Sequence, residues 1–414
     1  MNERMDNGII KLPYEIDSDS EYKKAFVKCM DKYMSWAVNF LERNEGFTKY
    51  LSEDEKDGII KAIVTDGGII KNCIKLYCSG DIVSASLRIK RLLARIIEED
   101  KGTGFIKSDL DKNYCSRMSA NYPFLYGEEN KRYIERLLEH DLTFFRARTD
   151  YFLDYKEMYH IPLDKRDLVG TERFSVPGIP CFYMGSSIYD IWLEMGRPAY
   201  SDFNVSAIKL TESGKKLQIL NLTANPYLLF GVNNISGNED EIENNVSLVR
   251  ALLRIYPLVI ATSIRNKSPR GKFRSDYIIS HLIMMSIKDL GIDGVAYLSK
   301  RIENHGEDYA MPQLVNIALP AFEESKINKK YGTICEKIEI TRAANYEEFL
   351  SLELGAGERN DKASYFAKTF VEPGYHNIAN GIVVSGRYVD YHDTGFYRFE
   401  NHVCSMKFHE LTNS

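Results

Sequence analysis

Over the first hundred residues, apolar side chains recur every three or four positions, a spacing typical of one buried helix face. Three such segments follow one another, at residues 21–41, 58–78 and 81–100. The middle segment contains Gly67 and Gly68, where we predict a break in the helix. Residues 98–113 carry charge and glycine without an apolar period and are typical of a linker. The amino-terminal part is therefore predicted to be a small helical bundle.

From about residue 141 the pattern changes to short apolar or alternating runs, which predict strands separated by helices. In residues 142–150, alternation places Phe144, Arg146 and Arg148 on one strand face. Further strands are expected at residues 205–210, 216–222, 293–300, 333–341 and 381–389, and helices at residues 275–291 (capped by Ser275) and 345–354. The chain as a whole is predicted to be an α+β protein.

Residues 173–196, RFSVPGIPCFYMGSSIYDIWLEMG, read as a turn, a strand and a helix. The prolines and glycine predict the turn, and Ser187 predicts the helix start by capping free amide groups. Gly196 predicts the helix end. Glu194 lies beside the apolar stripe of this helix. Taken alone, it is most simply a boundary glutamate whose stem covers apolar surface while its carboxylate reaches water.

Composition narrows the class of protein. The chain has 414 residues, with 54 Lys and Arg against 59 Asp and Glu and a net charge of −5, so neither nucleic acid nor an anionic membrane is an expected partner. The polar amino terminus does not resemble a signal peptide, and we identify no apolar run of membrane-spanning length. Seven scattered cysteines are typical of reduced thiols, and irregularly spaced histidines predict no metal site. A cytoplasmic protein is expected.

Three motifs resemble the RES domain family, which is named for an Arg, a Glu and a Ser that occur in this order. FFRAR (144–148) is similar to the opening strand of that family, and residues 173–195 are similar to its turn, strand and Glu-bearing helix. Residues 273–299 resemble its later helix and the Asp-Gly-apolar-x-Tyr-x-Ser strand. The resemblance covers residues 141–320. A RES-like catalytic domain over residues 141–414, with 321–414 as an extension, is then expected after a helical domain (1–115) and a linker (116–140).

The RES resemblance implies an ADP-ribosyltransferase-like mixed α/β fold that binds NAD and breaks its bond to nicotinamide. Carried over by position, the catalytic residues are Arg146, Glu194 and Ser299, and the residues that contact NAD are Arg146, Arg173, Tyr183 and Tyr297. NAD is then a substrate, and neither a separate cofactor nor a metal is implied. One carboxylate suffices for this chemistry, because nicotinamide leaves as a neutral molecule and needs no general acid.

Each of these residues also has a structural interpretation. Arg146 could be a surface arginine, Tyr183 a core aromatic residue and Ser299 the end of a strand. Within the matching framework, the functional interpretation is the stronger one. Two departures from the family pattern are visible, and the first puts the nucleotide contacts near Arg173 in question. Glu172, Phe174 and Ser175 replace Gly, Trp and Asn around Arg173, and Ser280 and His281 replace Pro and Gln in the later helix.

The amino-terminal part resembles the HEPN-like domains that precede some RES domains. HEPN ribonucleases need an Arg and a His a few residues apart on one helix, and no histidine precedes His140. A ribonuclease is therefore not predicted. Instead, this part is expected to bind a partner or a second copy of the chain. A neutralising antitoxin or a regulatory protein is an expected partner of the protein.

The leading hypothesis is a toxin or defence effector that degrades NAD, as a glycohydrolase or a phosphorylase. The alternatives are an ADP-ribosyltransferase that modifies a protein or nucleic acid and a non-catalytic nucleotide-binding module. The sequence leaves the acceptor of ADP-ribose open. The basic stretch KSPRGKFR (267–274) is predicted to be a solvated loop, with phosphate binding as the alternative.

Overall fold

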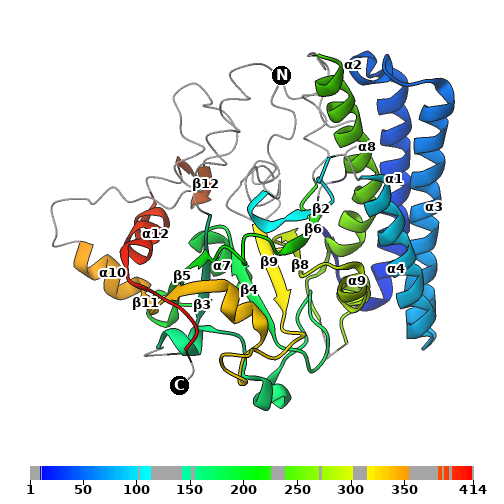
Figure 1. Cartoon of the computed structure of the whole chain (residues 1–414). Helices are drawn as coiled ribbons and strands as arrows, with labels where there is room; N and C mark the ends of the chain where they lie inside the picture. The colour runs from blue at the N-terminus through cyan, green and yellow to red at the C-terminus, as the bar shows by residue number, and fades with distance from the viewer. Residues whose placement is uncertain are drawn as a thin grey trace.

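The computed structural model of the chain describes residues 10, 12–100, 103–112, 142–150, 154–224, 238–269, 273–301, 315–353, 381–384, 387–390 and 394–412. It is an α+β protein in which amino-terminal helices lie beside a mixed β-sheet (Figure 1). The linker predicted at residues 116–140 lies outside the described residues.

A ten-stranded sheet has the order β14-β10-β5-β3-β4-β9-β8-β6-β2, with β11 paired to β5. Its strands are β2 (Lys107–Asp109), β3 (Thr143–Arg148), β4 (Cys181–Gly185), β5 (Asn204–Leu210), β6 (Gln218–Leu222), β8 (Gly294–Leu298), β9 (Val315–Pro320), β10 (Ile338–Thr341), β11 (Ala344–Asn345) and β14 (Phe408–His409). Strands β6 and β8 pair in parallel and the other neighbours in this sheet are antiparallel. Two strand pairs lie outside it: β1 (Tyr14–Ile16) with β7 (Ile264–Asn266), and β12 (Gly381–Val384) with β13 (Arg387–Asp390).

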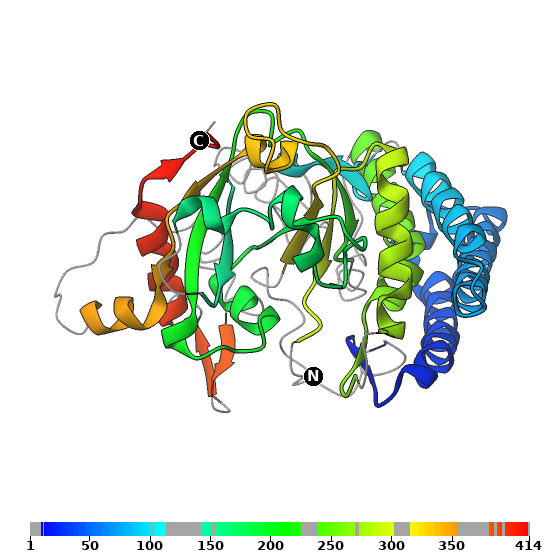
Figure 2. The same cartoon turned by 90° about the horizontal axis from the view of Figure 1, so that it is seen from below.

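Five of the helices form two layers beside the sheet. Helices α8 (Glu239–Thr262) and α9 (Ile278–Ile287) lie between the sheet and an outer layer of α1 (Tyr22–Arg43), α3 (Glu53–Cys78) and α4 (Ile82–Glu99), as Figure 2 shows. The short α2 (Glu45–Thr48) follows α1. One hydrophobic core runs through both layers into the sheet, from Ile63 and Leu93 through Val249 and Ile283 to Val295. The outer helices therefore continue the core of the sheet, while the domain boundaries drawn from the sequence stay a prediction.

Two further cores occur among the described residues. One contains Phe144, Phe182 and Ile317 of the central strands. The other joins Phe145 of β3 to α7 (Ile188–Glu194), α10 (Tyr346–Glu353) and α12 (Gly395–Ser405). Short 3-10 helices are η1 (Asp19–Glu21), η2 (Leu110–Lys112), η3 (Tyr155–Met158), η4 (Leu163–Leu168), η5 (Tyr200–Asp202), η7 (Ser275–Tyr277), η8 (Lys288–Leu290) and η11 (Thr333–Lys337).

Four local predictions were wrong. Helix α3 runs unbroken through Gly67 and Gly68. A Cβ at Gly67 would lie only 2.6 Å from Cε of Met30, so this glycine allows α1 to pack closely on α3. Residues 107–109, taken as linker, pair with β6 as an edge strand. Ser275 does not cap α9, since its hydroxyl donates to Asp19. The first half of the strand predicted at 333–341 is η11.

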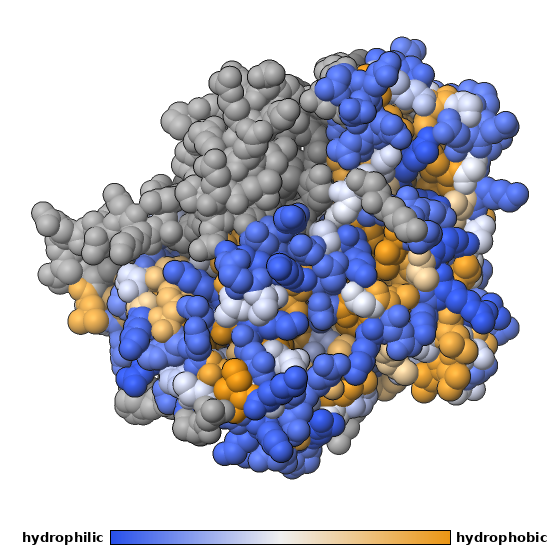
Figure 3. Space-filling view, viewed as in Figure 1, coloured by the Kyte–Doolittle hydropathy of each residue, from blue (hydrophilic) through white to orange (hydrophobic). Residues whose placement is uncertain are grey.

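Helix α8 has an apolar stretch, Ile242–Thr262, that is long enough to cross a membrane by length and composition. The sequence-based interpretation overlooked it. In the folded chain, 78% of its most apolar window is buried, as expected for a core helix. The face seen in Figure 3 is largely hydrophilic, with smaller apolar areas between the polar side chains. We therefore assign α8 to the protein core.

Candidate active site

The base of the site is a row of four residues on neighbouring strands. Phe145 of β3 lies opposite Gly185 of β4, Gly185 opposite Asn316 of β9, and Asn316 opposite Tyr297 of β8. Residues directly opposite each other in antiparallel strands project to the same face of the sheet. All four line one cavity of about 690 Å³. We call this row the cavity floor.

Glu194 reaches the cavity from α7, the helix that follows β4. Ser187 accepts a hydrogen bond from the Asp190 amide, as predicted for the cap, and Gly196 with a φ of 84° ends the helix. Glu400 of α12 accepts a hydrogen bond of 2.8 Å from the Ile188 amide and thereby anchors the first turn. Among the described residues, the buried Oε1 of Glu194 has no hydrogen-bond partner. A buried carboxylate oxygen without a partner is costly, which is why such an atom in a cavity points to a ligand.

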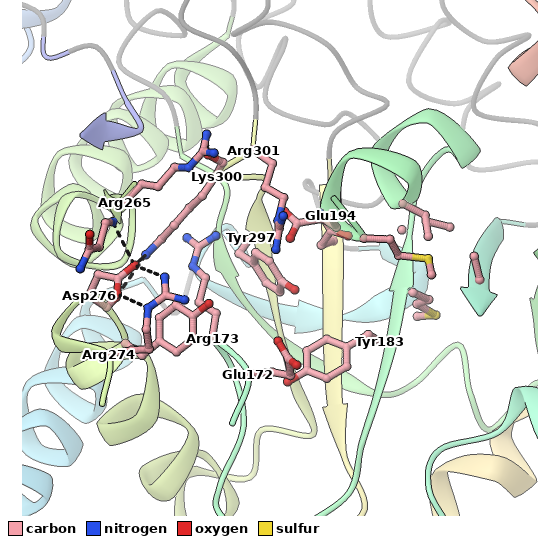
Figure 4. A pocket seen from close by; sticks show the side chains of 18 of the residues that line it. Glu172, Arg173, Tyr183, Glu194, Arg265, Arg274, Asp276, Tyr297, Lys300 and Arg301 are labelled. Carbon is pink, nitrogen blue, oxygen red and sulfur yellow. Dashed lines mark hydrogen bonds and ion pairs between the residues drawn. The ribbon is translucent and has the colours of Figure 1, made fainter. Parts of the chain in front are cut away.

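Arg173 is a buried cation in the same cavity, with 8% of its surface exposed. Its guanidinium carbon lies 4.8 Å from the ring centre of Tyr297 and 5.0 Å from that of Phe174, and Nη1 donates to the Leu298 carbonyl at 2.9 Å. Burial lowers the pKa of Arg173, whereas the Tyr297 and Glu194 groups raise it. Arg173 and Glu194 therefore attract each other electrostatically, and Figure 4 labels both side chains in the cavity.

The departures from the RES pattern form a connected turn around Arg173. The Ser175 hydroxyl accepts from the Glu172 amide at 3.0 Å and donates to the Glu172 carbonyl at 2.9 Å. Nε2 of His281, from α9, lies 2.9 Å from the same carbonyl oxygen. Phe174 stacks on Tyr297 with ring centres 4.4 Å apart. These substitutions hold the turn in place, so they leave Arg173 in the cavity.

Tyr183 and Tyr297 both line the cavity. The Tyr183 hydroxyl donates to the Phe174 carbonyl at 2.7 Å, which ties β4 to the Arg173 turn. Burial raises the pKa of each phenol well above its ordinary value, so both remain neutral and present apolar rings. Figure 4 shows the two rings near Glu194 and Glu172.

Arg146 also lines the cavity, but its guanidinium has protein partners. Its Nη1 donates to the Tyr183 carbonyl at 2.8 Å, and its carbon lies 4.8 Å from the Phe182 ring centre. Arg146 thus connects β3 to β4. Burial lowers its pKa, with a further lowering by Arg148. The alternation predicted for β3 is confirmed, because Phe144 and Phe145 enter different cores.

Ser299 is not among the described residues that line the cavity. Its side chain is buried, and Oγ accepts a hydrogen bond of 3.2 Å from the Arg301 amide. Through this hydrogen bond, Ser299 holds the backbone that leads to Arg301. A direct contact with substrate stays a prediction.

Sequence reasoning missed most of the charged lining of the cavity. Seven basic and three acidic residues are among its described lining residues: Arg146, Arg173, Arg265, Lys267, Arg274, Lys300 and Arg301 against Glu172, Glu194 and Asp276. The basic stretch 267–274 was the available signal, since Lys267 and Arg274 lie at its two ends. The other cations come from β7 and from the chain after β8, and no local pattern connects them.

Part of this charge is already paired. Arg274 contacts both carboxylate oxygens of Asp276 at 3.1 Å, and Lys300 lies 3.6 Å from the same carboxylate. Arg265 and Lys267 lie 3.8 Å from Glu15 of β1, at the protein surface. Arg265, Arg274 and Lys300 lie on one side of Tyr297 in Figure 4, and Glu194 lies on the other, with Arg301 beside it. Most of the cationic lining therefore lies apart from Glu194 and can face an anion, while Arg301 lies close to the carboxylate.

Asp190 lies one helical turn before Glu194 and is fully buried, with the Asn316 side chain as its polar neighbour. Burial and the Glu194 charge raise its pKa well above the ordinary value of 3.8, and the Asn316 amide opposes this. Between the unfolded and folded pKa, the folded state binds more protons, so stability falls as pH rises through this window.

The variant Asp190→Asn cannot ionise and is expected to escape this loss. Its free energy of unfolding relative to wild type should rise from pH 4 to pH 7, as measured by urea unfolding at several pH values. A difference that is constant with pH, or that falls toward pH 7, would contradict a protonated Asp190.

No group of three or more His, Cys, Asp or Glu side chains suited to a metal ion occurs among the described residues.

Comparison with known proteins gives a relative at low identity. The chain is 28% identical over 264 residues to a Bacillus subtilis (strain 168) protein named "Putative toxin YopC". The match covers 62% of this chain and 55% of the relative, so the chain spans about half the length of that protein. No family model matches the chain. No solved structure matches it.

Proposed function

We propose that the cavity binds NAD and that the protein breaks the bond between its ribose and nicotinamide. The carrying observation is the unpartnered Glu194 oxygen in a cavity that also holds Arg173, Tyr183 and Tyr297. Its volume of about 690 Å³ is within the range of small-molecule sites. Perturbed charged groups that converge in a cleft are typical of active sites.

The chemistry needs few protein groups. When the C1′–N bond breaks, its electron pair stays with nicotinamide, which leaves neutral, and positive charge develops on the ribose. A carboxylate held beside that ribose stabilises the charge, and its low-dielectric surroundings strengthen the effect. Glu194 is assigned this role. Water attack at C1′ with loss of its proton gives ADP-ribose, and phosphate attack gives the phosphorylated product.

The two sides of the cavity orient the substrate. NAD carries a pyrophosphate, and Arg265 and Lys267 offer charge on the basic side, while Arg301 lies beside Glu194 in Figure 4. On the other side, the Tyr183 and Tyr297 rings suit a planar nicotinamide. This orientation brings the ribose next to nicotinamide within reach of α7. It assigns the pyrophosphate to these cations and gives Arg146 a contact at the edge of the site.

The resemblance to RES domains supports the same activity, because Arg146, Glu194, Arg173, Tyr183 and Tyr297 fall on its motif positions and line one cavity. We accordingly propose a RES-like domain with an ADP-ribosyltransferase-like arrangement and a HEPN-like amino-terminal region. The relative's name supports a role as a toxin. A toxin that removes NAD would act on the cell that contains it, which suits a cytoplasmic protein with a neutralising partner.

ADP-ribosyl transfer is the second candidate, and Glu172 favours it. This second carboxylate also lines the cavity, where burial raises its pKa, Arg301 lowers it and Glu194 raises it. A carboxylate in this position can accept the proton of an incoming hydroxyl or amine. Transfer and hydrolysis then differ in the acceptor alone.

The fate of a label on the adenylate phosphate of NAD separates these reactions. With purified protein in phosphate-free buffer, hydrolysis predicts labelled ADP-ribose, and with phosphate present phosphorolysis predicts its phosphorylated form. Label that stays on added cell protein or nucleic acid would establish transfer. Label that remains in NAD under all conditions would overturn the proposal and leave a binding module.

A further inference from the structure

The cavity floor carries a polar group that the proposed chemistry does not use. Asn316 is 6% exposed, and its side chain meets the buried Asp190 carboxyl. Its Nδ2 carries two N–H groups, and no other described residue accepts a hydrogen bond from it. Asn316 lies between Gly185 and Tyr297 in the floor row. An amide donor left unsatisfied inside a cavity is expected to have a ligand, because a lost hydrogen bond at a buried group is costly.

The surroundings of Asn316 define the ligand chemistry. Phe145 and Tyr297 are its floor neighbours, and Tyr183 and Ile191 also line the cavity, so a planar, mostly apolar group fits beside it. Asn316 Oδ1 and Asp190 Oδ2 both approach Gly185, where a Cβ would lie 3.3 Å and 3.2 Å from them. Because Gly185 has no side chain, Asn316 of β9 and Asp190 of α7 can both pack against β4 at this position. Asn316 therefore offers a neutral donor beside aromatic rings, with Arg173 on the Tyr297 ring and the Asp190 carboxyl as the nearby ionisable groups.

We propose that Asn316 recognises the carboxamide of nicotinamide, with Nδ2 donating to the amide oxygen. The inference rests on the proposed function, because it assigns the leaving group of that reaction to the floor row. The contact holds the pyridine ring next to Tyr297 and so places the C1′–N bond beside Glu194. Asn316 is then a substrate-binding residue that the motif comparison did not select.

Two substrates separate this contact from a structural role. Thionicotinamide adenine dinucleotide replaces the amide oxygen by sulfur, which is a weak acceptor. Wild type and Asn316→Ala are each assayed with NAD and with this analogue. The ratio of their kcat/KM values is then compared between the two substrates. This ratio cancels the intrinsic reactivity of each leaving group.

With NAD, Asn316→Ala is expected to lower kcat/KM about fivefold to thirtyfold, corresponding to a hydrogen bond and a desolvated donor. With the thio analogue the two proteins should differ by less than about threefold. Asn221→Ala is the matched control, because Asn221 is also buried but donates to the Phe105 carbonyl and accepts from Thr223. It should lower stability and leave the substrate ratio unchanged.

Equal losses on both substrates, or none on either, would overturn the assignment of Asn316 while leaving NAD cleavage intact. If wild type cleaves neither substrate, binding of free nicotinamide and thionicotinamide is measured by ligand-observed NMR. If nicotinamide binds more tightly than thionicotinamide and this preference is lost in Asn316→Ala, the subsite is supported, while the absence of cleavage contradicts the proposed reaction. Equal binding of both compounds, or binding of neither, would remove the subsite as well.

Discussion

Replacing Glu194 by glutamine is expected to lower kcat/KM for nicotinamide release by roughly 100- to 1,000-fold, as loss of one preorganised electrostatic group does in other enzymes. Glutamine keeps the shape of the side chain but cannot balance the positive charge that develops on the ribose. The loss should fall mainly on kcat, because the charge exists only in the transition state.

The fold provides the control for this prediction. Glu194 Oε1 has no hydrogen-bond partner among the described residues, so the substitution breaks no contact of that atom and should leave the melting temperature near that of wild type. Glu172→Gln changes a second carboxylate of the same cavity and should reduce hydrolysis much less. An active Glu194→Gln protein, within threefold of wild type, would show that another group stabilises the ribose.

Arg146→Ala is expected to lower kcat/KM about tenfold to hundredfold, from the roughly 1.5–3 kcal/mol typical of a hydrogen bond to a charged group. Arg146 lines the cavity and connects β3 to β4 through the Tyr183 carbonyl, so its loss removes charge and also loosens the strand that carries Tyr183. Arg146→Lys should recover little, since an ammonium cannot reproduce the planar contacts of a guanidinium.

Arg148 offers a matched comparison on the same strand face. Its Nη2 donates to the Tyr159 carbonyl at 2.7 Å, and burial lowers its pKa, but it is not among the described lining residues of the cavity. Arg148→Ala should therefore lower the melting temperature to a similar degree with little loss of catalysis. Equal catalytic losses for the two alanine variants would show that both arginines act by supporting the fold. A larger loss for Arg148→Ala would mean that Arg148, and not Arg146, contacts the substrate.

Local signals along the chain predicted the part of the site that lies close together in sequence. Ser187, Gly196 and the apolar run before them defined the turn, strand and helix that carry Glu194, because capping and φ > 0 depend on residues a few positions apart. Alternation predicted the strand of Arg146 for the same reason. The RES motifs added Arg173, Tyr183 and Tyr297, which share the cavity.

The remaining features depend on contacts between distant segments. Helix α8 joins the amino-terminal helices to the sheet, but it was not predicted. A helix that is buried on both sides is apolar around most of its surface, so it lacks the one-sided apolar period by which a surface helix is recognised. Asn316 and Arg265 belong to β9 and β7, which also escaped prediction. Their meeting at the cavity is set by strand order, and no spacing in the sequence encodes it.

The central claim is that this cavity cleaves NAD at nicotinamide. The most direct test is to incubate the purified wild-type chain with NAD, with and without phosphate, and to measure free nicotinamide over time by chromatography. The account predicts nicotinamide in proportion to protein and time, and only a small fraction of that release with an equal amount of folded Glu194→Gln. Intact NAD after prolonged incubation with folded wild-type protein under both conditions would contradict it.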